Sequence, residues 1–592
     1  GVERAIAALG RGFLAHPANV ELREALRGGE LAAGDYYREL LRLVYRLIFL
    51  FVAEDRDLLH PPGADARARE RYRRFYSSER LRQLAERRRG TRHGDLYQAV
   101  CLVFSRLGAD AGCPELALPA LGGFLFSEEA TPRLDRSQVA NGDLLDAVRA
   151  LSFLEEGGVL RAVDYRNLGS EELGSVYESL LELHPELNLE AASFELARAA
   201  GHERKTTGSY YTPASLVSSL LDSALEPLLD EAARAADPER ALLDLSVCDP
   251  ACGSGHFLVA AAHRIAKRLA SVRTGEEEPA PEALRAALRD VVSRCLYGVD
   301  VSPMAVELCK VSLWLEALDP GRPLSFLDAH IRCGNSLLGA TPELLSAGIP
   351  DEAFKAIEGD DTKVAGALRR RNREERRGQL SLDDFVLDLE ARLAEDAAAL
   401  DAAPDDTIGA LREKERRFRS LAESEEYRRS RLLADAWCAA FVQEKTAHGP
   451  GITTGLIRRL AESANSLPQE TRRAIERLAD DFRFFHWHLE FPAVFAGAKG
   501  GFDCVLSNPP WDQIQLDDRE FFATSRPDIT AAANMAARKR AIAKLASEHP
   551  QLYAAYRAAV RSVESVQHFV HKSGCFPLTS YGRLNLAPLF VE

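Results

Sequence analysis

The sequence predicts an α/β protein with a doubly wound parallel sheet, a helical N-terminal region and a large helical insertion. Three observations support this fold class. Short apolar runs that end in an acidic residue alternate with helical periodicity between residues 205 and 340. A strand signal returns at 502–506, after a long segment of helix-forming composition. With 592 residues, the chain is also too long for a single ordinary domain.

Residues 1–200 form the expected helical N-terminal domain, in which almost no strand is predicted. The apolar run Leu40–Ala53 is interrupted by Arg42 and Arg46, so it predicts a buried core helix and not a membrane span. A basic segment at 67–93 contains interleaved glutamates and aromatic residues. Solvated helices are the favoured interpretation of this segment, and a patch for the DNA backbone is the alternative.

Residues 201–340 carry the first part of the expected α/β core. Two apolar runs end in Asp249 and Asp300, and each is followed by a segment with helical periodicity. Pro303 stands where proline is favoured, in the first turn of the second helix. The expected elements are strands at 242–248 and 296–299 and helices at 254–269 and 303–318.

Residues 341–480 predict a helical insertion, because they are rich in Ala, Glu, Arg and Leu and poor in strand formers. Residues 481–592 are expected to complete the core, with a strand at 502–506 and helix from 519 to 571. The sequence ends at Glu592 within a further helical pattern. We therefore expect the C-terminal part of the core to be incomplete.

The composition narrows the class of protein. None of the ten cysteines stands in a CxxC pair, which argues against a zinc ribbon and favours reduced thiols in the cytoplasm. No metal site and no membrane segment are expected. A net charge of −14 argues against non-specific coating of nucleic acid, although a local basic groove is enough for DNA binding.

The segment DPACGSGHFL, from Asp249 to Leu258, has the form of a cofactor loop between a strand and a helix. Gly253 and Gly255 allow the backbone to approach a ligand closely with positive φ. The Asp249 carboxylate can pair with the ammonium of a bound amino acid, which a pyrophosphate site would avoid. Because these two glycines do not complete G-x-G-x-x-G, a dinucleotide site is disfavoured.

Two further residues are candidates for contacts with a nucleoside. Asp300, at the end of the second strand, is placed to accept the two ribose hydroxyls, and capping of the following helix is the alternative. Asn335, in the segment CGNSLLG, can bind an adenine edge with its amide, and the alternative is that it only forms an ordinary turn.

The segment Asn508-Pro509-Pro510-Trp511 directly follows the FDCVL strand and is the sharpest chemical signal. Two prolines fix φ and make the loop rigid. The Asn508 side-chain oxygen and the Pro509 carbonyl can then accept hydrogen bonds from one –NH₂ group, and Trp511 offers a flat face for a base. This arrangement directs the nitrogen lone pair toward an electrophile.

Together, DPACGSG and NPPW resemble the motifs of DNA N6-adenine methyltransferases. The segment YYTP precedes the cofactor loop, as in their gamma-type arrangement. The helical N-terminus, GNSLLG and FHWHLEFP resemble the large type IIG-like and phage-defence members, namely the BREX (PglX-like) and DISARM-like enzymes. The resemblance covers roughly residues 200–340 and 480–592 well, and the N-terminal helices loosely. It implies a Rossmann-like methyltransferase core.

The resemblance also implies S-adenosyl-L-methionine as cofactor, double-stranded DNA with a flipped target adenine as substrate, and other defence-system proteins as partners. The N6 amine would attack the sulfonium methyl directly, without a metal. The implied catalytic residues are Asn508, Pro509, Pro510 and Trp511. The implied cofactor-binding residues are Tyr211, Thr212, Pro213, Asp249, Pro250, Ala251, Cys252, Gly253, Gly255, Asp300 and Asn335.

Arg583 departs from the family pattern, which often has an acidic residue there, and a target-recognition domain is not seen before Glu592. Three alternatives remain open. One is a bifunctional type IIG restriction enzyme, which is disfavoured because residues 1–204 contain no lysine for a nuclease site. Another is a DNA- or phage-sensing subunit that retains a cofactor pocket. The last keeps the chemistry and changes the acceptor to RNA or a protein glutamine.

Overall fold

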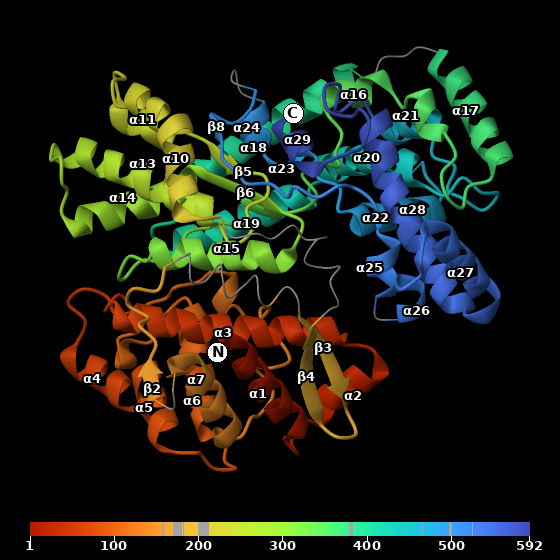
Figure 1. Cartoon of the computed structure of the whole chain (residues 1–592). Coiled ribbons are helices and arrows are strands. Elements are labelled where there is room, and N and C mark those ends of the chain that lie inside the picture. Colours follow the sequence, from red (N-terminus) through yellow and green to blue (C-terminus); the bar gives the residue numbers. More distant parts are fainter. Residues whose placement is uncertain are drawn as a thin grey trace.

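A four-stranded parallel sheet lies at the centre of the upper half of the molecule (Figure 1). The computed structural model describes residues 1–156, 159–169, 180, 183–198, 212–377, 383–463, 466–496, 500–523 and 525–592. The predicted α/β class with a parallel sheet and a helical N-terminal region is confirmed. The strands, in the spatial order β7-β6-β5-β8, are β5 (Val247–Asp249), β6 (Leu296–Asp300), β7 (Ile331–Cys333) and β8 (Cys504–Val505).

The two faces of the sheet belong to different hydrophobic clusters, because successive residues of a strand point to opposite faces. Val247 and Leu296 share a cluster with residues of α13 (His256–Thr274) and α15 (Pro303–Glu316). Their neighbours in the strands belong to an aromatic cluster that covers the other face. That cluster comprises Cys248, Tyr297, Val299, Phe485, Trp487, Phe491, Val494, Phe495 and Phe502.

The strand β8 comes from a distant part of the sequence and pairs in parallel with β5, in the register Val247 with Cys504. A clamp at the start of both strands fixes this register. The backbone N–H and the hydroxyl of Ser246 both donate to Asp503 Oδ2 at 2.9 Å, and the Asp503 N–H donates to the Ser246 carbonyl at 3.0 Å. The loops that follow the two strands therefore leave the same edge of the sheet.

The first apolar run is shorter as a strand than the sequence predicts. The predicted strand 242–248 is wrong in its first half, where α12 (Pro238–Leu243) forms. Proline at the start of α12 and the Asp237 carboxylate, which accepts from the Arg240 N–H, stabilise this helix. Leu242 is buried there, so its apolar character reflects helix packing.

The N-terminal region is built around α3 (Ala33–Asp55), the predicted core helix. Arg46 on this helix is 1% exposed and is surrounded by acceptors. Its guanidinium donates to the Leu125 carbonyl at 2.6 Å, to Thr131 Oγ1 at 2.6 Å and to Asp135 Oδ1 at 3.0 Å. The other helices are α1 (Val2–Ala15), α2 (Val20–Gly28), α4 (Ala66–Phe75), α5 (Ser78–Arg87), α6 (Asp95–Gly108) and α7 (Asn141–Ser152).

The expectation of an almost wholly helical region is wrong at four short stretches, residues 153–156, 159–162, 183–188 and 193–198. Two antiparallel hairpins form there, β1 (Phe153–Glu156) with β2 (Val159–Ala162) and β3 (Leu183–Asn188) with β4 (Ser193–Arg198). The composition of the second hairpin gives little strand signal. Tertiary contact instead stabilises it, because Phe194 packs on Tyr36 and against Gly10, where a Cβ would lie 2.6 Å from the ring.

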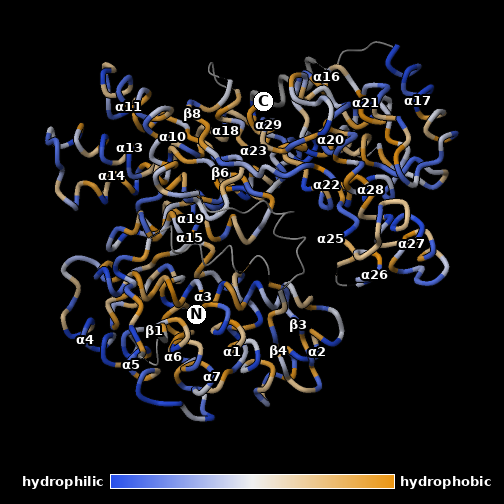
Figure 2. Tube along the Cα trace, in the orientation of Figure 1, coloured by the Kyte–Doolittle hydropathy of each residue, from blue (hydrophilic) through white to orange (hydrophobic). Residues whose placement is uncertain are grey.

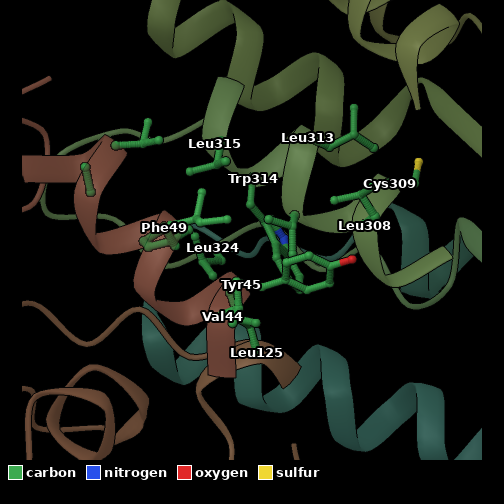
Figure 3. Close-up of a cluster of buried hydrophobic side chains, with 14 of the residues drawn as sticks. Val44, Tyr45, Phe49, Leu125, Leu308, Cys309, Leu313, Trp314, Leu315 and Leu324 are labelled. Atoms are coloured by element: carbon green, nitrogen blue, oxygen red, sulfur yellow. The ribbon is translucent and has the colours of Figure 1, made fainter. Parts of the chain in front are cut away.

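The helix α3 also holds the N-terminal region against the sheet-bearing part of the chain. It lies against α15, and side chains of both helices fill their interface (Figure 3). Tyr45 and Phe49 from α3 lie close to Trp314 from α15 in this view. At the edge of the interface, the Arg42 Nε donates to Glu307 Oε2 at 2.9 Å. Since α15 begins three residues after Asp300, this contact supports the edge of the sheet where the candidate site lies.

The helical structure predicted for residues 341–480 is confirmed where the structure describes them. Its core surrounds Trp437 and Phe441, and Phe569 from α28 (Pro550–Lys572) packs against both rings. Its helices are α16 (Pro342–Ala347), α17 (Thr362–Arg377), α18 (Asp383–Asp401), α19 (Ile408–Glu423), α20 (Glu425–Val442), α21 (Thr454–Glu462) and α22 (Gln469–Phe482). Before α28, the chain forms α25 (Asp518–Phe522), α26 (Pro527–Thr530) and α27 (Met535–Glu548).

Hydrophilic residues predominate on the peripheral helices α4 and α17 (Figure 2). The basic segment of the N-terminal region forms α4 and α5, where Arg73 pairs with Glu70 and Arg82 pairs with Asp55. Among the helices that the structure describes, none is both long and apolar enough to cross a bilayer.

Replacing Arg46 with alanine should destabilise the N-terminal region strongly, because it leaves several buried acceptors without a donor. The expected loss is about 3–5 kcal/mol, which lowers the first thermal transition by roughly 10 °C. Circular dichroism melting curves measure it. Arg38→Ala is the matched control on the same helix, since Arg38 and its partner Asp35 are both only half-buried and should contribute less than about 1 kcal/mol. Equal melting temperatures for the two variants would contradict this account of α3.

Candidate active site

The glycine loop connects β5 to α13. It begins at Asp249, whose side chain is buried, and Gly255 caps the first turn of the helix. Gly253 has φ +51° and Gly255 has φ +85°, both in the left-handed region that favours glycine. A Cβ at Gly255 would lie 2.7 Å from Cys309 Sγ, whereas one at Gly253 would meet nothing within 4 Å. Gly255 thus permits close packing, and Gly253 leaves open space beside the loop.

Hydrogen bonds tie this loop to its neighbours on the sheet edge. The Cys252 N–H donates to the Val299 carbonyl of β6 at 3.0 Å. The Pro250 carbonyl accepts from Ser336 Oγ at 2.6 Å, which joins the loop to the turn after β7. The Ala251 N–H donates to Asp249 Oδ1 at 3.0 Å. The loop is therefore held in shape by two neighbouring segments and by one hydrogen bond of its own.

The Asp249 carboxyl is the most perturbed acid of the site. Burial raises its pKa to about 7, and the charge of Asp300 adds to this. The Ala251 N–H and the Ser507 side chain act in the opposite direction. Near neutral pH the group is therefore poised between its neutral and ionised forms, and a nearby cation would favour the carboxylate.

Asp300 lies at the end of β6 and holds two backbone segments. Its Oδ2 accepts from the Gly253 N–H at 3.0 Å, and its Oδ1 accepts from the Ser302 N–H at 2.7 Å. Burial raises the pKa of this carboxyl. The cap of α15 is the Ser302 hydroxyl, so Asp300 is not the capping residue. Each carboxylate oxygen has a second acceptor site, which is available for a ligand hydroxyl.

Asn335 lies in the turn after β7. Its Oδ1 accepts from the Leu337 N–H at 3.1 Å, and its backbone N–H donates to the Arg483 carbonyl at 2.7 Å. The side chain therefore has the turn-forming role that the sequence left open. Its Nδ2 group carries two further donors for a partner such as an adenine edge.

The motifs GNSLLG and FHWHLEFP pack directly on one another. A Cβ at Gly334 would lie 2.4 Å from the Phe485 ring, and one at Gly339 would lie 2.0 Å from the Phe485 carbonyl oxygen. The Trp487 indole donates to the Ser336 carbonyl at 3.0 Å. The sequence did not predict Ser336 and Trp487 as residues of the site. Both lie in motifs that the sequence identifies, but only the fold shows that these two motifs contact one another.

The NPPW loop continues β8 beyond the sheet. Because Leu506 lies level with Asp249, Asn508 lies two residues further, roughly 7 Å along the strand direction. The Asn508 Nδ2 group donates to Thr212 Oγ1 at 3.0 Å. Its Oδ1 accepts from the Trp511 indole N–H at 3.0 Å, and Trp511 is 68% exposed. In this structure, the atom predicted to accept a target amine therefore accepts from an indole.

The fold brings most of the predicted residues to one edge of the sheet. The cofactor loop, Asp300 and the turn of Asn335 follow three adjacent strands, and the NPPW loop follows the fourth, with Pro509 and Pro510 half-buried. Thr212 is buried, whereas Pro213 is exposed at the start of α10 (Ala214–Ala224). Tyr211 lies outside the described residues.

Two family models match this part of the chain. An N-6 DNA Methylase model matches residues 190–347, which include the glycine loop, Asp300 and Asn335. An Eco57I restriction-modification methylase model matches residues 294–538, which include the NPPW loop. The resemblance found in the motifs is confirmed, since this region is homologous to N6-adenine DNA methyltransferase families.

Two relatives and one solved structure are also similar to parts of the chain. A putative type II restriction enzyme and methyltransferase of Methanocaldococcus jannaschii is 29% identical over 38% of this chain. The adenine-specific methyltransferase PglX of Streptomyces coelicolor is 30% identical over 24% of it. The chain spans only 22% and 11% of the length of these relatives. The type IIL restriction-modification enzyme MmeI in complex with DNA is 18% identical, over 56% of this chain and 40% of that one, with a TM-score of 0.34.

Asp249→Asn should stabilise the ligand-free protein at high pH. The folded protein holds the Asp249 proton up to a pKa of about 7, whereas the unfolded chain releases it near the ordinary aspartate pKa of 3.8. Ionisation therefore lowers stability as the pH rises through this window, by up to about 4 kcal/mol, and asparagine avoids this loss. Melting temperatures of variant and wild type should diverge between pH 4 and 7 and stay apart above pH 7. The exposed Asp244→Asn is the control, and a constant difference at all pH values would contradict the prediction.

Proposed function

We propose that this chain is the catalytic part of an adenine-N6-specific DNA methyltransferase that uses S-adenosyl-L-methionine. The observation that carries the proposal is the parallel pairing of β5 with β8. It places a loop suited to an amino-acid cofactor beside a loop suited to a planar –NH₂ group. The homology of residues 190–538 to N6-adenine DNA methyltransferase families supports the same reaction.

The residues of the glycine loop fit the proposed cofactor. The buried Asp249 carboxyl offers a counter-charge for an ammonium group, and Gly253 leaves the space that a side chain would otherwise fill. Asp300 retains acceptor sites for two ribose hydroxyls, and Asn335 retains donors for the adenine edge. The first N–H groups of α13 favour the carboxylate of a bound amino acid, as helix N-termini do. We accordingly propose the sheet to be a Rossmann-like cofactor-binding core.

S-adenosyl-L-methionine, when bound, supplies an electrophilic methyl group. Asn508 Oδ1 and the Pro509 carbonyl would accept the two N–H groups of the target amine, and both acceptors strengthen as positive charge grows on that nitrogen. The prolines keep these acceptors in place without reorganisation. The exposed Trp511 would stack on the extruded base. The proton leaves the amine after it has gained the methyl group, so no strong base is required.

The proposed substrate is double-stranded DNA whose target adenine leaves the helix. The names of the two relatives support a role in a restriction–modification or phage-defence system, with other proteins of that system as partners. We also propose domain divisions near residues 200, 340 and 480. The division near residue 480 separates two segments that share one hydrophobic core, since α28 packs against the core of the insertion.

Asn508→Ala should lower methyl transfer to DNA by a factor of about 100 to 1,000 or more and leave cofactor affinity within about twofold of wild type. Asp300→Ala should instead weaken the affinity for the cofactor. Transfer of tritium from labelled cofactor to DNA measures the first effect, and equilibrium dialysis measures the second.

Asn534→Ala is the matched control for Asn508→Ala, because Asn534 caps α27 and lies outside both loops. It should retain wild-type transfer. Equal incorporation by wild type and Asn508→Ala would remove Asn508 from the mechanism. Transfer to RNA or to a protein amide, with none to DNA, would keep the chemistry and change the substrate.

Cofactor binding should depend on pH through Asp249. An ammonium group pairs with the ionised carboxylate, so below pH 7 binding must first displace a proton from this buried acid. The dissociation constant should rise about tenfold for each pH unit below 7, as linkage requires. Calorimetry between pH 5.5 and 7.5 tests this with the ligand ammonium still charged. Asp249→Asn should bind more weakly with a flat profile, and a flat profile for wild type would contradict the assignment.

A further inference from the structure

The Asn508 amide is held from both sides by side chains. An indole N–H can only donate, so the amide atom that faces Trp511 must be the oxygen. The amide nitrogen then faces Thr212, whose hydroxyl oxygen accepts from it at 3.0 Å. Both contacts agree on one orientation of the amide. The sequence separates Thr212 from Asn508 by 296 positions, so the fold alone creates this pair.

Thr212 is well suited to fix an orientation. The residue is 8% exposed, and the following Pro213 restricts the backbone at the start of α10. A threonine side chain also has few rotamers, because its Cβ is branched. The acceptor that faces the Asn508 nitrogen is therefore held by both the chain and the packing.

We propose that Thr212 is a positioning residue for the Asn508 amide, and this rests on the proposed function. An amide has two similar orientations, and only one of them presents its oxygen to a target amine. The reversed orientation would set –NH₂ against –NH₂, donor against donor. The donor-only Trp511 indole sets the productive orientation, and Thr212, by accepting from Nδ2, holds the amide in it before the substrate enters. One hydrogen bond of this kind shifts such an equilibrium roughly two- to tenfold.

The Trp511 contact supports a planar N–H group as the donor that the oxygen would receive. The indole N–H is a neutral, planar donor, as is the exocyclic amine of an adenine. It occupies the same oxygen that the proposed reaction requires, on a residue exposed enough to move aside. The target amine would take the place of the indole N–H, and Thr212 would hold the amide during the exchange.

Residue Thr212 has a second interpretation, namely a contact with the methionine side of the cofactor, as the family resemblance implies. The two roles predict different kinetic changes. A cofactor contact affects the dissociation constant of the cofactor, whereas a positioning role affects kcat with the cofactor bound. Valine has the shape of threonine without the acceptor, so Thr212→Val separates the two roles.

In full-length protein, Thr212→Val should lower kcat for methyl transfer to DNA about tenfold, while the cofactor dissociation constant changes less than about twofold. Thr212→Ser restores the acceptor and should recover most of kcat. Thr274→Val, the same change at the end of α13, is the control and should behave as wild type. A cofactor affinity that falls tenfold with kcat retained would overturn the proposal and favour the cofactor contact.

A second measurement needs neither cofactor nor DNA. In the ¹H–¹⁵N spectrum of the ligand-free protein, Trp511→Phe identifies the Trp511 indole signal by its loss. That signal should move in Thr212→Val, because the amide that it contacts is no longer fixed. It should stay in place in Thr212→Ser and Thr274→Val. An unmoved signal in Thr212→Val would overturn the proposal.

The two measurements also separate failure of this proposal from failure of the proposed function. If wild type transfers no methyl group to DNA, the proposed function fails, and the spectrum still tests whether Thr212 orients the amide. If wild type transfers methyl groups and Thr212→Val does so with unchanged kcat, the positioning role fails and the proposed function stands.

Discussion

The parallel pairing of β5 with β8 is the constraint on which the candidate site depends. Ser246 and Asp503 are 257 positions apart, and their reciprocal hydrogen bonds fix the register of the two short strands. Side chains alternate between the two faces of a strand. A shift by one residue would therefore exchange the side chains that pack on α13 and α15 with those that pack on the aromatic cluster. It would also move the NPPW loop relative to Asp249. The short strands are sufficient because the sheet is covered on both sides, as parallel sheets generally are.

The surrounding helices hold this edge of the sheet from two directions. The N-terminal region reaches it through the contact between α3 and α15, and α15 starts just after Asp300 (Figure 3). On the other face, the aromatic cluster around Phe485 connects the turn of Asn335 to the end of the insertion. The FHWHLEFP segment, which follows the insertion, is therefore part of the support for the site, since it packs on GNSLLG.

The sequence predicted the features that are local in the chain. The glycine loop, the strand of Asp300 and the helical insertion were found because glycines, short apolar runs and helical periodicity mark them directly. The second N-terminal hairpin was missed because its stability comes from Phe194 packing on α1 and α3, and its composition favours helix. Leu242 was assigned to a strand because a buried helix and a buried strand give the same apolar signal over a few residues. The pairs Ser246–Asp503 and Thr212–Asn508 have no local signal at all.

The hydrogen bonds of Asn508 illustrate a general requirement for a site that must bind a donor. A half-buried amide oxygen without a partner would be unfavourable, so a ligand-free protein needs a substitute donor that leaves easily. A backbone N–H in a rigid turn would satisfy the oxygen permanently and block the site. The Trp511 indole satisfies it from an exposed side chain, and Thr212 satisfies the nitrogen from a buried one. The contact from the exposed residue is thus the one that can exchange, and the contact from the buried residue is the one that, in the proposed reaction, would keep the amide oriented.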